Sequence, residues 1–346
     1  MEPYPSFYKR MKSLLYFPAI VLLFIWSGLS AQIKNFVFIG MDRDRLKDTS
    51  ILGSPLFDGV QVAYSWRQLE PQKDLFDFRM IREDLALLKK YHKKLFIQLQ
   101  DVSFSPKNIP APAYLLNDPA YGGGVNKQYH FTNENETEFS EAGWAIRRWD
   151  TTVQKRLHKL YRELGEDFDG SIEGINTAET SVDFGKGPLH PPGFSFQRYM
   201  DATTENIAAL KYAFPHSPVI VYANFMPGGL MPFEDSIYLS TIYHFAWKNN
   251  IGVGGPDLLP YKPGQMRNSY GFIRESYLKV WSGVSVQDGA QEYINPKTQQ
   301  KITAAEIYQF GKDYLHLDYI FWGTEEPFFH SKVIPFLLSV KKEKAN

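Results

Sequence analysis

The sequence predicts a single (β/α)8 barrel of the TIM type, in the α/β class, with a long loop after its third strand. From residue 34 onward, short apolar runs of strand length alternate with helical patterns, which is typical of βαβ units and a parallel sheet. Eight such apolar runs can be counted in a chain of 346 residues. An open nucleotide-binding sheet would require a glycine-rich phosphate-binding turn after an early strand, and the sequence has no such turn. These observations favour a closed barrel over an open doubly wound sheet.

The N-terminal segment has a different pattern. Lys9 and Arg10 precede an apolar run, Leu14–Trp26, that ends in small residues. This order is typical of a signal peptide, and the run is too short for a comfortable bilayer span. We therefore predict a signal peptide or N-terminal anchor over residues 1–31 and a barrel catalytic domain over 32–346. The protein is expected to be secreted or periplasmic, with membrane association only if the segment is not cleaved.

The first half of the barrel begins with two apolar strands, Lys34–Met41 (KNFVFIGM) and Gly59–Tyr64 (GVQVAY). A helix opens at Asp77, because apolar residues recur after it at the i, i+4 and i+7 positions. The third strand is Lys94–Gln100 (KLFIQLQ). The polar and aromatic stretch over residues 102–148 that follows is predicted to be a long functional loop.

The second half of the chain alternates in the same way. A helix begins at Thr151 and is expected to end at Gly165, a residue type common at helix C-termini. Thr303 and Glu306 have the spacing of a capping box, which predicts another helix start. The predicted strands are 170–176, 218–225, 251–259, 283–287 and 318–322. The predicted helices are 151–165, 194–214, 235–249, 270–281, 303–315 and 331–340.

The composition excludes several classes of function. Lysine plus arginine and aspartate plus glutamate are equal at 38 each, so nothing favours a nucleic-acid partner. The chain has no cysteine, which excludes disulfides, thiolate metal sites and cysteine nucleophiles. The eight histidines form no H-E-x-x-H or similar ligand motif, and no G-x-S-x-G occurs. We therefore expect no catalytic metal, no cofactor and no serine-esterase chemistry.

In a barrel of this type, reactive groups lie where strands end and βα loops begin. Many acidic residues follow the predicted strands. A glycosidic bond is hydrolysed by two such carboxyl groups, one protonated and one ionised, which lie about 5 Å apart in a retaining enzyme. The acids at strand ends are Asp42, Asp44, Glu70, Asp101, Glu179, Asp257, Asp288, Glu292, Glu325 and Glu326.

Three segments carry a resemblance to a known family. Residues 59–71, which read GVQVAYSWRQLEP, and then Phe76-Asp-Phe78, resemble the second-strand region of clan A glycoside hydrolases. The segment Glu173–Glu179 (EGINTAE) is similar to their fourth-strand end, where an asparagine lies just before the acid/base glutamate. Phe321-Trp322 resembles the aromatic platform under the sugar in the −1 subsite. The resemblance implies that Glu179 is the general acid/base, whereas Glu173, within the strand, is expected to form an internal salt bridge.

The sequence departs from the family pattern at two places. Asn176 and Glu179 are separated by two residues, although the family usually has them adjacent. The family's nucleophile is a glutamate that ends the seventh strand, where this chain reads VQDGAQE over residues 286–292. Either Asp288 or Glu292 is then the nucleophile, or Gln287 has replaced it.

Several further residues are expected to bind substrate. Asp42 and Gln100 point toward the same rim, and Asn224 ends the fifth strand. Trp322 is the expected platform for a sugar ring, since aromatic faces pack against the apolar faces of pyranoses. The expected substrate-binding residues are Asp42, Trp66, Gln100, Asn176, Asn224 and Trp322.

The sequence therefore predicts a glycoside hydrolase that cleaves O-glycosidic bonds in a poly- or oligosaccharide, by a two-carboxylate mechanism. A catalytically silent, glycan-binding barrel of the cell envelope is the alternative, because the seventh strand has no standard nucleophile. A lyase or transglycosylase on the same scaffold is a third interpretation.

Overall fold

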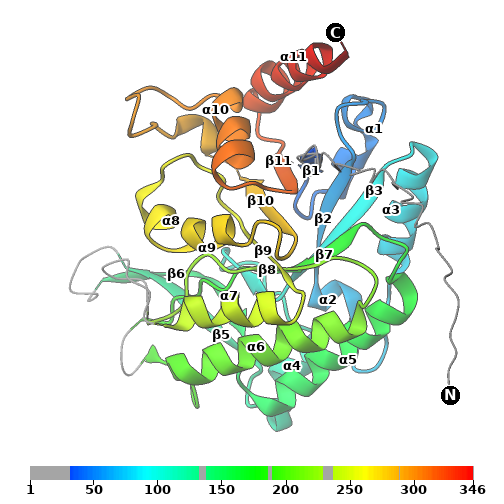
Figure 1. Ribbon diagram of the computed structural model, residues 1–346. Helices are drawn as coiled ribbons and strands as arrows, with labels where there is room; N and C mark the ends of the chain where they lie inside the picture. The colour runs from blue at the N-terminus through cyan, green and yellow to red at the C-terminus, as the bar shows by residue number, and fades with distance from the viewer. Residues whose placement is uncertain (1–31, 132–137, 186–188, 229–236, 288, 346) are drawn as a thin grey trace, which may run out of the picture. The chain divides into compact units, whose positions relative to one another are not determined.

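The computed structural model describes residues 32–131, 138–185, 189–228, 237–287 and 289–345. The segment Ile33–Asn346 forms a compact unit. In it, eight parallel strands close into a barrel in the order β1-β11-β10-β9-β8-β7-β3-β2, which confirms the predicted (β/α)8 barrel (Figure 1). The predicted signal peptide or anchor, residues 1–31, lies outside the described residues.

All eight barrel strands lie within or close to the runs predicted for them. Every neighbouring pair in the barrel is parallel, as the alternation of strands and helices requires. The strands are β1 (Lys34–Phe38), β2 (Gly59–Ser65), β3 (Lys94–Gln100), β7 (Gly174–Thr177), β8 (Val219–Tyr222), β9 (Gly252–Gly255), β10 (Ser282–Val286) and β11 (Tyr319–Gly323).

The helices follow the strands, with short additional turns in the loops. The α-helices are α1 (Thr49–Leu52), α2 (Trp66–Leu69), α3 (Arg79–Lys90), α4 (Ala113–Asn117), α5 (Thr151–Phe168), α6 (Phe196–Ala213), α7 (Tyr238–Lys248), α8 (Pro263–Arg267), α9 (Ser269–Glu275), α10 (Ala304–Gln309) and α11 (Ile334–Ala345). The predicted capping box at the start of α10 is present, since Thr303 and Glu306 bond each other's backbone N–H.

Two predicted helix ends are wrong. Helix α9 ends at Glu275, although its helix was predicted to continue to residue 281. Helix α5 continues past Gly165 to Phe168. A Cβ atom at Gly165 would lie 2.1 Å from the carbonyl oxygen of Ala213 in α6. Gly165 is therefore a point of close helix–helix approach rather than a helix terminus, and the two helices lie side by side in Figure 1.

The stretch over residues 102–148, predicted to be a loop, has secondary structure of its own. It carries β4 (Val102–Ser103), β5 (Val125–Phe131) and β6 (Phe139–Ile146), which form an antiparallel sheet in the order β4-β6-β5, together with α4. The sequence concealed these strands because β5 (VNKQYHF) and β6 (FSEAGWAI) lack the regular alternation of apolar and polar residues that predicts a strand.

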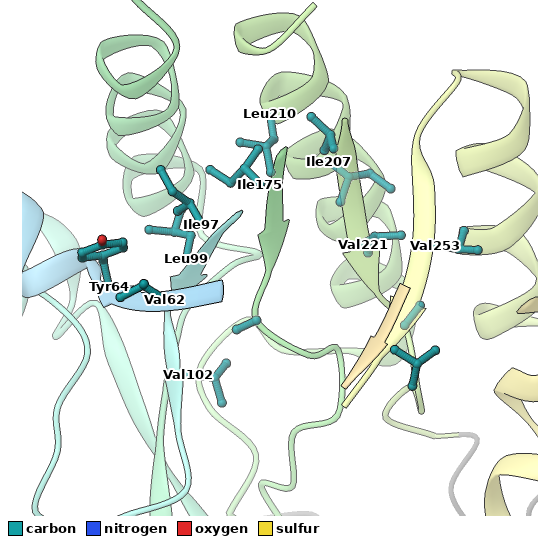
Figure 2. Packing of buried hydrophobic residues seen from close by; sticks show 14 of the residues in the cluster. Val62, Tyr64, Ile97, Leu99, Val102, Ile175, Ile207, Leu210, Val221 and Val253 are labelled. Carbon is teal, nitrogen blue, oxygen red and sulfur yellow. The ribbon is translucent and has the colours of Figure 1, made fainter. Parts of the chain in front are cut away.

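The main hydrophobic layer lies between the strands and the surrounding helices. Outward side chains of neighbouring strands, among them Ile97, Ile175 and Val221, lie toward Ile207 and Leu210 of α6 (Figure 2). Each of these side chains is 1% exposed or less. Burial of one such residue contributes roughly 1.5–3 kcal/mol, so this layer carries much of the stability of the fold.

Inward side chains fill the amino-terminal half of the barrel with aromatic rings. Phe36, Phe96 and Phe321 pack with ring centroids 4.9–6.0 Å apart. A Cβ atom at Gly59 or Gly174 would lie within 2.7 Å of these rings, so the inward glycines provide the space that the rings occupy. The barrel is therefore closed at this end.

A polar layer follows toward the carboxyl ends of the strands. The Gln61 amide donates to Asn176 Oδ1 at 2.9 Å and to the Tyr222 hydroxyl at 3.1 Å. Tyr222 and Ser285 share a hydrogen bond of 2.8 Å. All four residues are 1% exposed or less, so this layer is a satisfied network that forms a firm floor for the site beyond it.

Candidate active site

A cavity of about 420 Å³ opens at the carboxyl ends of the barrel strands. Strand β3 contributes Gln98 and Gln100, and Gln287 follows β10. Glu179 lines the cavity beyond the end of β7, and Tyr222 joins it to the polar layer beneath. The cavity therefore occupies the place where barrel enzymes carry their reactive groups.

The carboxyl group of Glu179 is the most perturbed acid in this cavity. Burial raises its pKa to about 7. Asn224 Nδ2, which donates to Glu179 Oε2 at 2.5 Å, acts in the opposite direction, and the negative charge of Asp257 adds to the increase. A carboxyl group with this pKa still holds a proton near neutral pH, as a general acid must.

A buried ion pair supports the backbone at Glu179. Arg148 forms a bidentate pair with Asp101, Nε to Oδ2 at 2.8 Å and Nη2 to Oδ1 at 2.5 Å. Its Nη1 donates to the carbonyl oxygen of Glu179 at 3.0 Å and to the Tyr199 hydroxyl at 2.7 Å. Tyr199 in turn donates to the carbonyl oxygen of Thr180 at 2.9 Å. The network fixes the backbone on both sides of the Glu179–Thr180 peptide bond.

Three of the sequence-predicted binding residues come together at this site. Asp42 and Gln100 line the cavity, and Asn224 bonds Glu179 directly. The Gln100 amide donates to Gln98 Oε1 at 2.9 Å, which orients both glutamines on one wall. Asp42 lies 3.5 Å from the guanidinium of Arg45, three residues further along in the turn that follows β1.

The other predicted binding residues lie elsewhere. Asn176 is buried in the polar layer beneath the cavity. Trp322 is fully buried and donates to Asn35 Oδ1 at 3.0 Å, because side chains alternate along β11 and Phe321 takes the inward direction. Trp66 is also fully buried and donates to Glu70 Oε2 at 2.8 Å. Both side chains are inaccessible to a ligand, so Trp322 is not the predicted sugar platform and Trp66 is not the predicted substrate-binding residue.

Of the two acids predicted after the seventh strand, only Glu292 is among the described residues, and it does not line the cavity. Asp288 lies outside the described residues. Glu292 belongs to a 3-10 turn, its side chain is 65% exposed, and it pairs with Lys301 at 2.6 Å rather than lining the cavity. Gln287, which directly follows β10, does line the cavity.

A carboxylate on another wall of the cavity was not predicted as a site residue. Glu325 follows β11 and lines the cavity, and its Oε2 accepts a hydrogen bond from the Gly289 backbone N–H at 2.7 Å. In the closed order of eight strands, β11 is four strands away from β7, so the two strands lie on opposite sides of the barrel. Glu325 and Glu179 therefore enter the cavity from facing walls.

Sequence reasoning missed Gln98 and Arg148 as residues of the site, and it named Glu325 only as one of the ten acids at strand ends. Gln98 had a usable signal, because it alternates with Gln100 and so shares its inward face. Arg148 had none, since an arginine before a helix is ordinarily a solvated surface residue. Within the described ranges, no three histidine, aspartate or glutamate side chains gather as metal ligands. In those same ranges, no helix has both the length and the apolar character to span a membrane.

Comparisons with known proteins give a distant similarity. No family model matches the chain, and no curated protein matches it. One solved structure, described as "Crystal Structure of a glycoside hydrolase", is 13% identical, with a TM-score of 0.48, over 86% of this chain and 89% of that one. A similarity at this level assigns no activity to this chain.

Proposed function

We propose that this protein is a glycoside hydrolase that acts on a poly- or oligosaccharide, with Glu179 as the general acid. The observation that carries the proposal is a half-buried carboxyl group with a pKa of about 7 in an open cavity at the carboxyl ends of the barrel strands. Such a group donates a proton to the leaving oxygen at neutral pH. The side-chain amides of Gln98 and Gln100 offer hydrogen bonds to sugar hydroxyls.

The second carboxylate in this mechanism is Glu325. It acts as the general base that removes a proton from water as the water attacks the anomeric carbon. Because Glu325 and Glu179 enter from opposite walls, we infer the wide spacing of an inverting enzyme, about 6.5–9.5 Å, which leaves room for that water. Gln287 supports this choice, since an amide at the end of the seventh strand is not a carboxylate nucleophile.

The test uses purified full-length protein and the variants Glu179→Gln, Glu325→Gln and Asp288→Asn, assayed on neutral and acidic oligosaccharides. Nuclear magnetic resonance of the first product identifies its anomer. We expect inverted product from the parent protein and large losses of turnover in the first two variants only. Retained configuration would show that the inverting mechanism is incorrect. A loss of turnover in Asp288→Asn with normal turnover in Glu325→Gln would show in addition that Asp288, not Glu325, is the second carboxylate.

The alternative is a barrel that binds glycan without cleaving it, and Gln287 is the observation that favours it. Binding of the same oligosaccharides to the parent protein, with no product after prolonged incubation, would establish this alternative. We also propose that residues 1–31 direct export. Amino-terminal sequencing of protein recovered from the culture medium or periplasm tests this point.

A further inference from the structure

A second cavity, of about 470 Å³, adjoins the first. The two share Phe38, Gly40, Gln100 and Phe104 in their walls, so they form one continuous cleft. We call the part around Glu179 the acidic lobe. The part lined by Ser65, Arg67, Gln68 and the segment 102–110, beyond Phe104, is the basic lobe.

The two lobes differ in charge. The acidic lobe has three carboxylates in its wall, Asp42, Glu179 and Glu325, with Arg45 next to Asp42. The basic lobe has two cations, Arg67 and Lys107, and no aspartate or glutamate among the residues that line it. Neither cation forms an ion pair with any described residue, so both charges are available to a ligand.

The basic lobe has a fixed geometry. Arg67 Nε donates to the carbonyl oxygen of Ala111 at 2.8 Å, which holds the guanidinium in place while its terminal nitrogens make no hydrogen bond to a described residue. The Arg67 backbone N–H donates to the carbonyl oxygen of Pro110, also at 2.8 Å. A guanidinium held in this way is oriented for a bidentate contact with an anion before the ligand arrives.

The facing wall is held by side chains that bond its backbone. Ser103 Oγ donates to the carbonyl oxygens of Ser105 and Asn108. Trp144 Nε1, from β6, donates to the carbonyl oxygen of Pro106 at 2.8 Å, next to Lys107. Phe104 lies at the junction of the two lobes with 58% of its surface exposed. An exposed ring at a cleft junction is suited to stacking against a sugar face.

We propose that the basic lobe is a subsite for a sugar that carries an anionic group, a uronate carboxylate or a sulfate ester. Arg67 and Lys107 bind the anion, Phe104 stacks on the neighbouring ring, and the next unit of the chain enters the acidic lobe. The substrate of the proposed hydrolase is then an acidic polysaccharide. The assignment of the cleft as a catalytic site rests on the proposed function, whereas the anion preference of the basic lobe does not.

The experiment measures binding by calorimetry in the full-length Glu179→Gln variant, which removes the proposed acid and so limits turnover. The probes are tetragalacturonate, its fully methyl-esterified form, and a sulfated galactan tetrasaccharide. Arg67→Ala and Lys107→Ala are added one at a time to this background. Lys248→Ala, an exposed lysine at the end of α7 that lines neither lobe, is the matched control.

We expect at least one anionic probe to bind about tenfold or more tightly than the esterified probe. Arg67→Ala and Lys107→Ala should each reduce that preference, Arg67→Lys should restore part of it, and Lys248→Ala should leave it unchanged. The better of the two anionic probes identifies carboxylate or sulfate as the group recognised. Equal affinity for charged and esterified probes, or no effect of either cation, would overturn the proposal.

The outcomes separate this inference from the proposed function. Acidic glycans that bind through Arg67 but are not cleaved by the parent protein would support the anionic subsite and contradict the hydrolase. Cleavage of neutral glycans with no preference for acidic ones would support the hydrolase and contradict the anionic subsite.

Discussion

Two glutamates on either side of β7 have opposite surroundings. Glu173, before the strand, bonds the Lys34 ammonium at 2.5 Å and the Tyr319 hydroxyl at 3.0 Å, as the sequence predicted for an internal salt bridge. Glu179, after the strand, accepts a hydrogen bond from the neutral amide of Asn224 and lies near the carboxylate of Asp257. The ammonium partner thus gives Glu173 a structural role, whereas burial raises the pKa of Glu179 and makes it available for proton transfer.

The largest effect that separates the two glutamates is on turnover. Glu179→Gln should reduce kcat by about 10²–10⁴-fold, since a general acid contributes a factor of this size. Glu173→Gln is the matched control, because it removes the same charge at the amino-terminal end of the barrel and should leave kcat near that of the parent protein. Equal losses in the two variants would show that the difference between the sites is not functional.

The support beneath Glu179 gives the next effect. Arg148→Met removes one partner of a buried pair and leaves the Asp101 carboxylate uncompensated, which should lower the free energy of unfolding by about 3–5 kcal/mol. Urea denaturation measures this loss. The double variant Arg148→Met/Asp101→Leu, which leaves no unpaired charge, should recover part of it. If the single variant is as stable as the parent protein, the network does not hold Glu179 in the way described.

Stability should also depend on pH through Glu179. Its pKa is about 7 in the folded protein against 4.5 for an ordinary glutamate, so the folded state binds more protons between these values. The free energy of unfolding should therefore fall as pH rises from about 4.5 to 7, by up to about 3 kcal/mol. Thermal denaturation of the parent protein and of Glu179→Gln across this pH range isolates the contribution of Glu179 to stability. The variant should lack this decline in the free energy of unfolding. Parallel curves for the two proteins would contradict the assignment.

The smallest effects tune the pKa of Glu179 in both directions. Removal of the Asn224 amide in Asn224→Ala should raise this pKa, because the hydrogen bond stabilises the ionised form. Asp257→Asn should lower it, because a nearby negative charge is removed. The basic limb of the pH profile of kcat/KM should move to higher pH in the first variant and to lower pH in the second. Shifts in the same direction would show that the two neighbours do not act as the geometry implies.

The fold was more accessible from the sequence than the site was. Strands are encoded locally, by runs such as Lys94–Gln100, so all eight could be located and the closed barrel inferred. Whether a side chain points into or out of the barrel depends on the register of its strand, and a shift of one residue reverses the direction. Trp322 was misassigned to the cleft for this reason, while its neighbour Phe321 is the inward ring.

Contacts between distant segments set the chemistry of the site. The Arg148–Asp101 pair joins residues 47 positions apart, and Glu325 faces Glu179 only because the barrel closes. A single sequence carries no local signal for either relation. Position alone marked ten acids at strand ends, and the resemblance of residues 173–179 singled out Glu179 among them.

The protonation state of the Glu179 carboxyl group is the most direct test of its role as the proton donor. Carboxyl-carbon nuclear magnetic resonance of glutamate-labelled protein, with Glu179→Gln to identify the signal, gives its titration midpoint. We expect a midpoint near pH 7, because burial and the nearby Asp257 carboxylate raise the pKa of Glu179 to about this value. A midpoint near 4.5, the value of an ordinary glutamate, would show that Glu179 is ionised at neutral pH and is not the proton donor.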